Sequence, residues 1–185
     1  AVKKIPAELC GLLNKDPKSP FHNLIVRQSD EKNKAVITHS AIMKVIERSL
    51  KPPLGALNQF KGLGNSQSDI DGMYRTMILF WIAVKETFPE AWGLPTTKSR
   101  LMHSAGIRVI GDLMDQIMLR ADSSNDPQSE IKLSLKRIKP HCRWTSGEWE
   151  ELGWQWNEVQ STGPHIRRLS DYLIHLDRSL SRKAA

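Results

Sequence analysis

The sequence predicts a mainly α-helical fold, a single helical domain with a small N-terminal strand pair, for a chain of 185 residues. Apolar residues recur three and four positions apart over most of the chain, which is the spacing of one face of a helix. Prolines and glycines divide this pattern into segments of helix length. We expect a helix, a small hairpin and a helix within 1–64, and a helical core within 65–185.

The first elements are predicted to be a helix and the small hairpin. Apolar residues over 5–14 have helical spacing, and the proline-containing run 16–20 ends that helix because proline cannot continue it. The β-branched runs 23–27 and 35–38 are short and are separated by the polar stretch 28–34, which is typical of a hairpin.

A second helix is predicted to begin at Thr38 or Ser40, because a hydroxyl side chain at this place can accept a hydrogen bond from a free N–H of the first turn. Pro52 and Pro53 end this helix. Residues 54–68 carry three glycines and no clear period, so we expect a loop there.

Two long helices follow in the prediction. Ser68 offers an N-cap, and residues 69–84 are apolar around most of the helix circumference, which is typical of a central, buried helix. Pro89 closes this helix, and Thr97 or Ser99 is expected to start the next one.

Glycines within that next helix predict a close packing contact or a kink. Gly106 and Gly111 each cost about 1 kcal/mol relative to alanine in a helix interior, so a structural reason for them is expected. The polar run 123–127 then predicts a break, followed by a helix over 128–138 and an amphipathic final helix over about 164–180.

The composition is that of an ordinary globular domain. Hydrophobic residues make up 39% and charged residues 25% of the chain, which excludes a wholly disordered chain and a collagen-like repeat. Two cysteines are too few for a disulfide framework, which favours a cytoplasmic location. No apolar run approaches the roughly 18 residues that a membrane span requires, so no membrane partner is expected.

The net charge of +7 is unevenly distributed. Residues 127–145 hold five basic and one acidic side chain, whereas 146–161 hold four acidic side chains and no basic one. Such asymmetry is typical of a surface that attracts a polyanion, most often nucleic acid. Many basic domains bind no nucleic acid, so charge alone leaves both interpretations open.

Two groups of residues suggest chemistry. Cys142 beside Arg143 could be a thiolate nucleophile, since a neighbouring cation lowers the pKa of a thiol, or a buried small hydrophobic residue. Asp126, Glu130 and Lys132 are the residue types with which some nucleases hold Mg²⁺, but they occur at a predicted helix start. We therefore expect no catalytic residue, no metal site and no cofactor.

Four tryptophans lie within the segment 144–156. Aromatic rings can stack on nucleotide bases, but tryptophans at this spacing can equally close one end of a helical core with their N–H groups at its rim. Four glutamates in and just after this segment would repel phosphate, which favours the packing interpretation.

Short motifs spread over most of the chain carry a family resemblance. They are Leu12-Leu-Asn14, Ser19-Pro-Phe21, Phe80-Trp81, Phe88-Pro-x-x-Trp92, the block Leu101 to Met114 around Gly106-Ile107, Trp144, and Ile166-Arg-Arg-Leu-Ser-Asp-Tyr-Leu173. In these motifs the chain resembles the C-terminal helical part of DGQHR-domain proteins. The best known branch of that family is the DndB-like proteins associated with bacterial DNA phosphorothioate modification.

The motif that names the family is only partly present. Asp71-Gly-Met-Tyr-Arg75 matches three of the five positions and lacks the central Gln-His pair, so the role of the motif is not transferred to it. The resemblance implies that the chain is a fragment or a stand-alone C-terminal domain of such a protein.

We therefore expect an accessory or regulatory DNA-binding domain of a bacterial DNA-modification or phage-defence system. The alternatives are a protein–protein interaction or dimerisation module without catalytic activity, and an enzyme that uses Cys142 or the acidic group. The expected partners are DNA, other proteins of a DNA-modification system, and a second copy of the chain. The candidate phosphate contacts are Lys132, Lys136, Arg137, Lys139, Arg143, Arg167 and Arg168.

Overall fold

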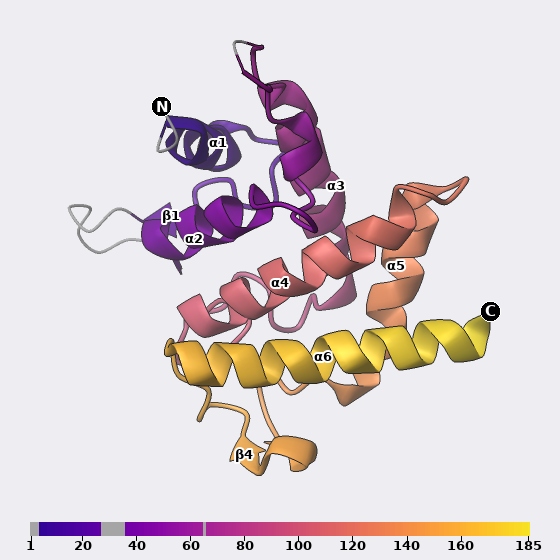
Figure 1. The fold of residues 1–185 in the computed structure, drawn as a ribbon. Coiled ribbons are helices and arrows are strands. Elements are labelled where there is room, and N and C mark those ends of the chain that lie inside the picture. The colour runs from indigo at the N-terminus through magenta and orange to yellow at the C-terminus, as the bar shows by residue number, and fades with distance from the viewer. Residues whose placement is uncertain (1–3, 27–35, 65) are drawn as a thin grey trace.

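The computed structural model describes residues 4–26, 36–64 and 66–185, and these residues form six α-helices and two pairs of short strands (Figure 1). The predicted mainly α fold is confirmed. The helices are α1 (Lys4–Lys15), α2 (His39–Ser49), α3 (Ile70–Thr87), α4 (Ser104–Ala121), α5 (Pro127–Ile138) and α6 (Gly163–Ala184). Within the described ranges, none of the helices combines the length and the apolar character needed to cross a membrane.

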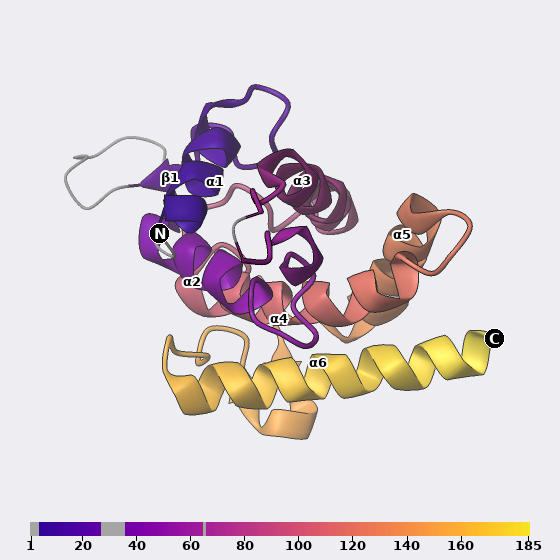
Figure 2. The ribbon, with the colours of Figure 1, turned by 45° about the horizontal axis from the view of Figure 1, so that its top comes forward.

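Helix α4 lies at the centre of the molecule. It contacts α2, α5 and α6, and it runs between α2 on one side and α6 on the other (Figures 1 and 2). Helix α3 packs against α1 and α5. Helix α3, which the sequence predicts to be the central buried helix, has fewer buried residues than α4, the next helix along the chain.

Two glycines of α4 mark close contacts, as the sequence predicts. A Cβ atom added at Gly111 would lie 2.7 Å from the Cγ2 atom of Val45 in α2, and one added at Gly106 would overlap the carbonyl oxygen of Arg100. Both distances are shorter than real carbon contacts allow, so these positions let α2 and the segment before α4 approach the helix backbone.

The N-terminal strand pair is parallel, so the predicted hairpin is wrong. Strand β1 (Ile25–Val26) pairs with β2 (Ile37–Thr38), with Ile25 opposite Ile37. Both isoleucines are buried, and the carbonyl of Leu24 accepts hydrogen bonds from the N–H groups of Val36 and Ile37. The connection 27–36 is longer than a tight hairpin turn, so it does not dictate an antiparallel pair. The polar stretch 28–34 lies outside the described residues.

Side chains cap both α2 and α3, and the cap of α2 is a predicted residue. Thr38 caps α2, and its hydroxyl accepts a hydrogen bond from the N–H of Ala41. The prediction of Ser68 for α3 is wrong by one residue, because Asp69 accepts from the N–H of Gly72 at 2.9 Å. Ser68 instead accepts from the backbone of the preceding loop.

Helix α4 begins later than Thr97 or Ser99, so that prediction is also wrong. The N–H of Ser99 donates to the Pro95 carbonyl, which holds this segment in a turn, and the N–H of Arg100 donates to the Trp144 carbonyl. His103 is the N-cap, and its Nδ1 atom accepts from the first turn of the helix.

The tryptophan-rich segment forms a small antiparallel hairpin that the sequence does not predict. Strand β3 (Glu148–Trp149) pairs with β4 (Trp154–Gln155), and the hairpin projects below α6 in Figure 1. Trp144 and Trp149 are buried in the core, which supports the packing interpretation. The N–H of Trp149 is buried as well and has no hydrogen-bond partner among the described residues, so it does not lie at a rim as expected.

Candidate anion-binding cleft

The predicted cations of α5 and of the residue that follows it do not form one free patch. Lys132 lies 3.6 Å from the carboxylate of Glu86 in α3, and Lys139 lies 3.7 Å from that of Glu90. Lys136 is exposed and Arg137 is half-buried. Opposite charges at these distances weaken the attraction of Lys132 and Lys139 for an external anion.

Arg143 and Arg168 are engaged within the protein as well. The Nη1 atom of Arg143 donates to the carbonyls of Pro140 and Cys142, at 2.8 and 2.9 Å. The guanidinium of Arg168 lies 4.9 Å from the centre of the Trp154 ring, a cation–π geometry.

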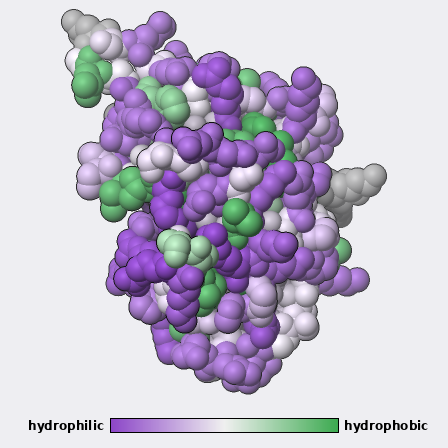
Figure 3. All heavy atoms as spheres, turned by 90° about the vertical axis from the view of Figure 1, so that its right-hand side faces the viewer, coloured by the Kyte–Doolittle hydropathy of each residue, from purple (hydrophilic) through white to green (hydrophobic). Residues whose placement is uncertain are grey.

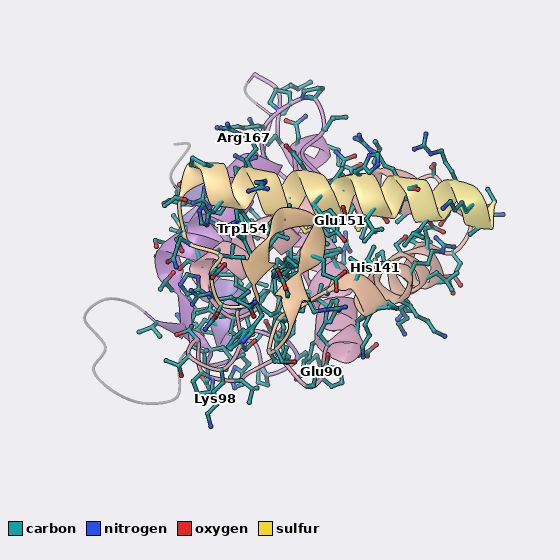
Figure 4. The ribbon with its side chains drawn as sticks, turned by 90° about the horizontal axis from the view of Figure 1, so that it is seen from below. Glu90, Lys98, His141, Glu151, Trp154 and Arg167 are labelled. Atoms are coloured by element: carbon teal, nitrogen blue, oxygen red, sulfur yellow. The ribbon has the colours of Figure 1, made fainter. Side chains whose placement is uncertain are left out.

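Arg167 lies elsewhere, on the side of α6 away from Trp154 (Figure 4). It lines a cleft of about 400 Å³ that is bordered by the end of α2, the loop 51–55, α4 and α6. Three further basic residues line the same cleft: Arg48, Lys51 and Arg108. Packing thus brings together cations from three distant parts of the sequence.

Two of the three carboxylates in this cleft are held by protein donors. Asp112 accepts from the Nε of Arg48 at 2.9 Å and from the hydroxyl of Ser170 in α6, also at 2.9 Å. Asp115 accepts from the Ser49 hydroxyl at 2.7 Å and from the N–H of Ala56 at 2.9 Å. Burial raises the pKa of Asp115 above its usual range. The third carboxylate, Asp171, is exposed on α6.

Arg108 projects from α4, and Asp112 lies one turn further along the same helix. The Nε atom of Arg108 is buried and has no hydrogen-bond partner in the part of the chain that the structure describes. A buried N–H of a charged group that lacks an acceptor is costly, so a bound anion or water at this point would stabilise the structure.

Buried polar contacts fix α6, and therefore Arg167, against α4. Asp177 is 1% exposed, and Arg120 of α4 donates two hydrogen bonds to it, at 2.7 and 2.8 Å. Although burial alone would lower the pKa of Arg120, the hydrogen bonds and charges of Asp177 and Glu130 raise it. Arg178 adds a bond of 2.6 Å to Gln116 of α4.

The thiol considered as a nucleophile is poorly suited to that role. The sulfur of Cys142 donates to the Ile138 carbonyl at 3.5 Å. Burial raises the pKa of this thiol to about 12, despite the opposing effect of Arg143. The thiol therefore stays protonated near neutral pH.

The acidic group considered for metal binding serves the fold. Asp126 caps α5 by accepting from the N–H of Ser129, and Glu130 accepts from Arg120 and Ser134. Across residues 4–26, 36–64 and 66–185, no group of three or more His, Cys, Asp or Glu side chains is arranged to hold a metal ion.

No family model, no curated protein and no solved structure matches this chain. The resemblance to DGQHR-domain proteins therefore stays a prediction.

Sequence reasoning found one of the four cleft cations, Arg167, and missed the other three. One signal for Arg108 is present in the sequence, because this charged residue interrupts the apolar run of α4 between Ile107 and Val109. Arg48 and Lys51 carry a weaker signal, since cations are common near the C-terminal end of any helix.

Proposed function

We propose that this chain is a nucleic-acid-binding domain that contacts phosphate through the cleft between α2, α4 and α6. The supporting observation is the convergence of Arg48, Lys51, Arg108 and Arg167 on one cleft. The family resemblance adds the proposal that the nucleic acid is DNA and that the domain is an accessory part of a bacterial DNA-modification or phage-defence system.

The chemistry of the cleft suits a phosphate ligand. Guanidinium groups bind phosphate oxygens through paired hydrogen bonds, and such charge-assisted bonds are stronger than neutral ones. Contacts to phosphate position a protein on nucleic acid without reading its sequence. We therefore expect binding with little sequence preference and with affinity that falls as salt rises.

Fluorescence anisotropy with labelled DNA at about 50 mM and about 200 mM salt tests this proposal. Arg108→Gln and Arg167→Gln should each weaken binding roughly tenfold, the value of one charge-assisted hydrogen bond. Arg75→Gln is the matched control, because Arg75 is exposed on α3 and pairs with Asp71 of the same helix. It removes the same charge outside the cleft.

Lys136→Gln separates the cleft from the predicted α5 surface. Lys136 is exposed and outside the cleft, so its replacement should change affinity no more than Arg75→Gln does. Absence of DNA binding at tens of micromolar, or binding that Lys136→Gln weakens and Arg167→Gln does not, would refute the proposal.

A second candidate function is protein interaction through the tryptophan-rich hairpin. Trp154 and Trp156 are only partly buried, and Trp154 stacks on His165 with ring centres 4.5 Å apart. Figure 3 shows hydrophobic residues scattered among hydrophilic ones on the side of the molecule that it presents. Light scattering across a concentration series tests this candidate, since self-association that Trp156→Ala abolishes would support it.

A further inference from the structure

We infer that the cleft binds a terminal phosphate, the phosphomonoester at the end of a nucleic-acid strand, in preference to the internal diesters of its backbone. This inference rests on the proposed function and names its ligand more narrowly. The charge of the cleft, its size and the groups at its floor support it.

The free positive charge of the cleft is concentrated rather than spread. Arg48 is paired with Asp112, which leaves Lys51, Arg108 and Arg167 to act on a ligand at one place. A protein that follows a duplex backbone needs free cations along its length, whereas Lys132 in α5 and Lys139 just after it face glutamates. A phosphomonoester carries a charge of about −1.5 to −2 near neutral pH, whereas a diester carries a single negative charge. Positive charge concentrated at one place therefore favours the phosphomonoester at a strand end.

The size of the cleft agrees with a ligand of this kind. A volume of about 400 Å³ falls at the lower end of the range of small-molecule sites, which extends from about 300 to about 1,000 Å³. A phosphate with its sugar and base is a ligand of that class, and a duplex segment is not.

The floor and one edge of the cleft supply further donors. The buried Nε of Arg108 lacks a partner among the described residues. Gly163, the first residue of α6, lines the same cleft, and a Cβ atom added there would meet nothing within 4 Å. The Thr162 side chain makes no capping hydrogen bond. The first turn of α6, in which Pro164 has no N–H, therefore adds the N–H of Gly163 and a positive dipole end to a site built by arginines.

The position of Asp171 disfavours a backbone that continues past the site. This carboxylate is exposed on α6, one turn beyond Arg167. A strand that extended in both directions would bring a second phosphate toward it, with like-charge repulsion. A strand end leaves the cleft in one direction and avoids this cost. The other carboxylates, Asp112 and Asp115, accept hydrogen bonds from protein donors.

The test compares DNA of one sequence with and without a phosphate at the strand end, by anisotropy with the label at the opposite end. Wild-type protein should bind the phosphorylated DNA at least about tenfold more tightly, the value of one added charge-assisted contact. Arg108→Gln should remove this preference. Arg108→Lys should retain part of it, because lysine keeps the positive charge but lacks the paired N–H donors of a guanidinium group. Arg75→Gln should leave the preference unchanged.

The outcomes separate the two proposals. Equal affinity for both DNAs, with weaker binding by the cleft variants, overturns the terminal-phosphate inference and leaves the proposed function standing. A preference that survives in Arg108→Gln also overturns the inference, provided that circular dichroism shows the variant folded. Binding of neither DNA overturns both proposals.

Discussion

Removal of the Asp177 carboxylate should strongly destabilise the contact between α4 and α6. This side chain is 1% exposed and accepts two hydrogen bonds from Arg120. Asp177→Ala leaves the Arg120 guanidinium partly buried without its main counter-charge. The loss of one partner of a buried pair costs about 3–5 kcal/mol.

The structure places the expected loss at the lower end of that range. The Arg120 side chain is 28% exposed and keeps weaker contacts, at 3.4 Å to Glu130 and 3.1 Å to Ser134. We therefore expect a loss of about 3 kcal/mol in the free energy of unfolding. For a chain of this length, each kcal/mol lowers the melting temperature by about 2–4 °C, so Asp177→Ala should melt about 6–12 °C below wild type.

Urea denaturation followed by circular dichroism measures this loss, and a thermal scan measures the shift in melting temperature. The double variant Arg120→Ala/Asp177→Ala completes a cycle, and it should be less destabilised than the sum of the two single variants. A loss under about 1 kcal/mol for Asp177→Ala, a value typical of exposed pairs, would refute the argument that burial makes this pair important.

Three further changes have expected outcomes of their own. Gly111→Ala should lower the free energy of unfolding by up to about 2 kcal/mol, because the new methyl group overlaps Val45 and the gain in helix propensity offsets only part of the strain. Gly11→Ala has open space around it and should raise the free energy of unfolding by up to about 1 kcal/mol. Urea denaturation that ranks the two variants the other way would contradict the packing argument. The Cys142 thiol should resist a thiol reagent at pH 8 in the folded protein and react once urea unfolds it, since burial raises its pKa to about 12; rapid native reaction would contradict this. Burial raises the pKa of Asp115 in the folded state, so this group's favourable contribution is present at low pH and is lost as pH rises from its usual value of 3.8 through the raised value. The unfolding free energy of Asp115→Asn minus that of wild type should therefore increase with pH over this window, and urea titrations that give a constant difference would contradict it.

Local patterns predicted most of the helices because the apolar periodicity of an amphipathic helix is contained in the helix itself. Capping residues were less well predicted where two suitable residues are neighbours, as at Ser68 and Asp69. The direction of the N-terminal strands could not be predicted, since strands of two residues carry no pattern that distinguishes a parallel from an antiparallel pair.

The candidate site was harder to predict because tertiary packing both builds it and removes its rivals. Lys132 and Lys139 lie in a basic stretch of sequence, yet each forms an ion pair with a glutamate, Glu86 in α3 or Glu90 just after it. Arg108 and Arg167 are far apart in the sequence and meet only because α6 packs along α4. The net charge of a segment therefore predicts that basic side chains bind an anion, but it does not show which acidic side chains pack beside each of them.

The order of the chain has a consequence for when the cleft exists. One wall comes from residues 48–55, the floor from α4 and the other wall from α6, which follows both of them in the sequence. A ribosome-bound intermediate that ends before residue 163 lacks that wall and one arginine. Ligand capture is therefore deferred until α6 has been synthesised and has packed against α4, so anion affinity would report the docking of α6.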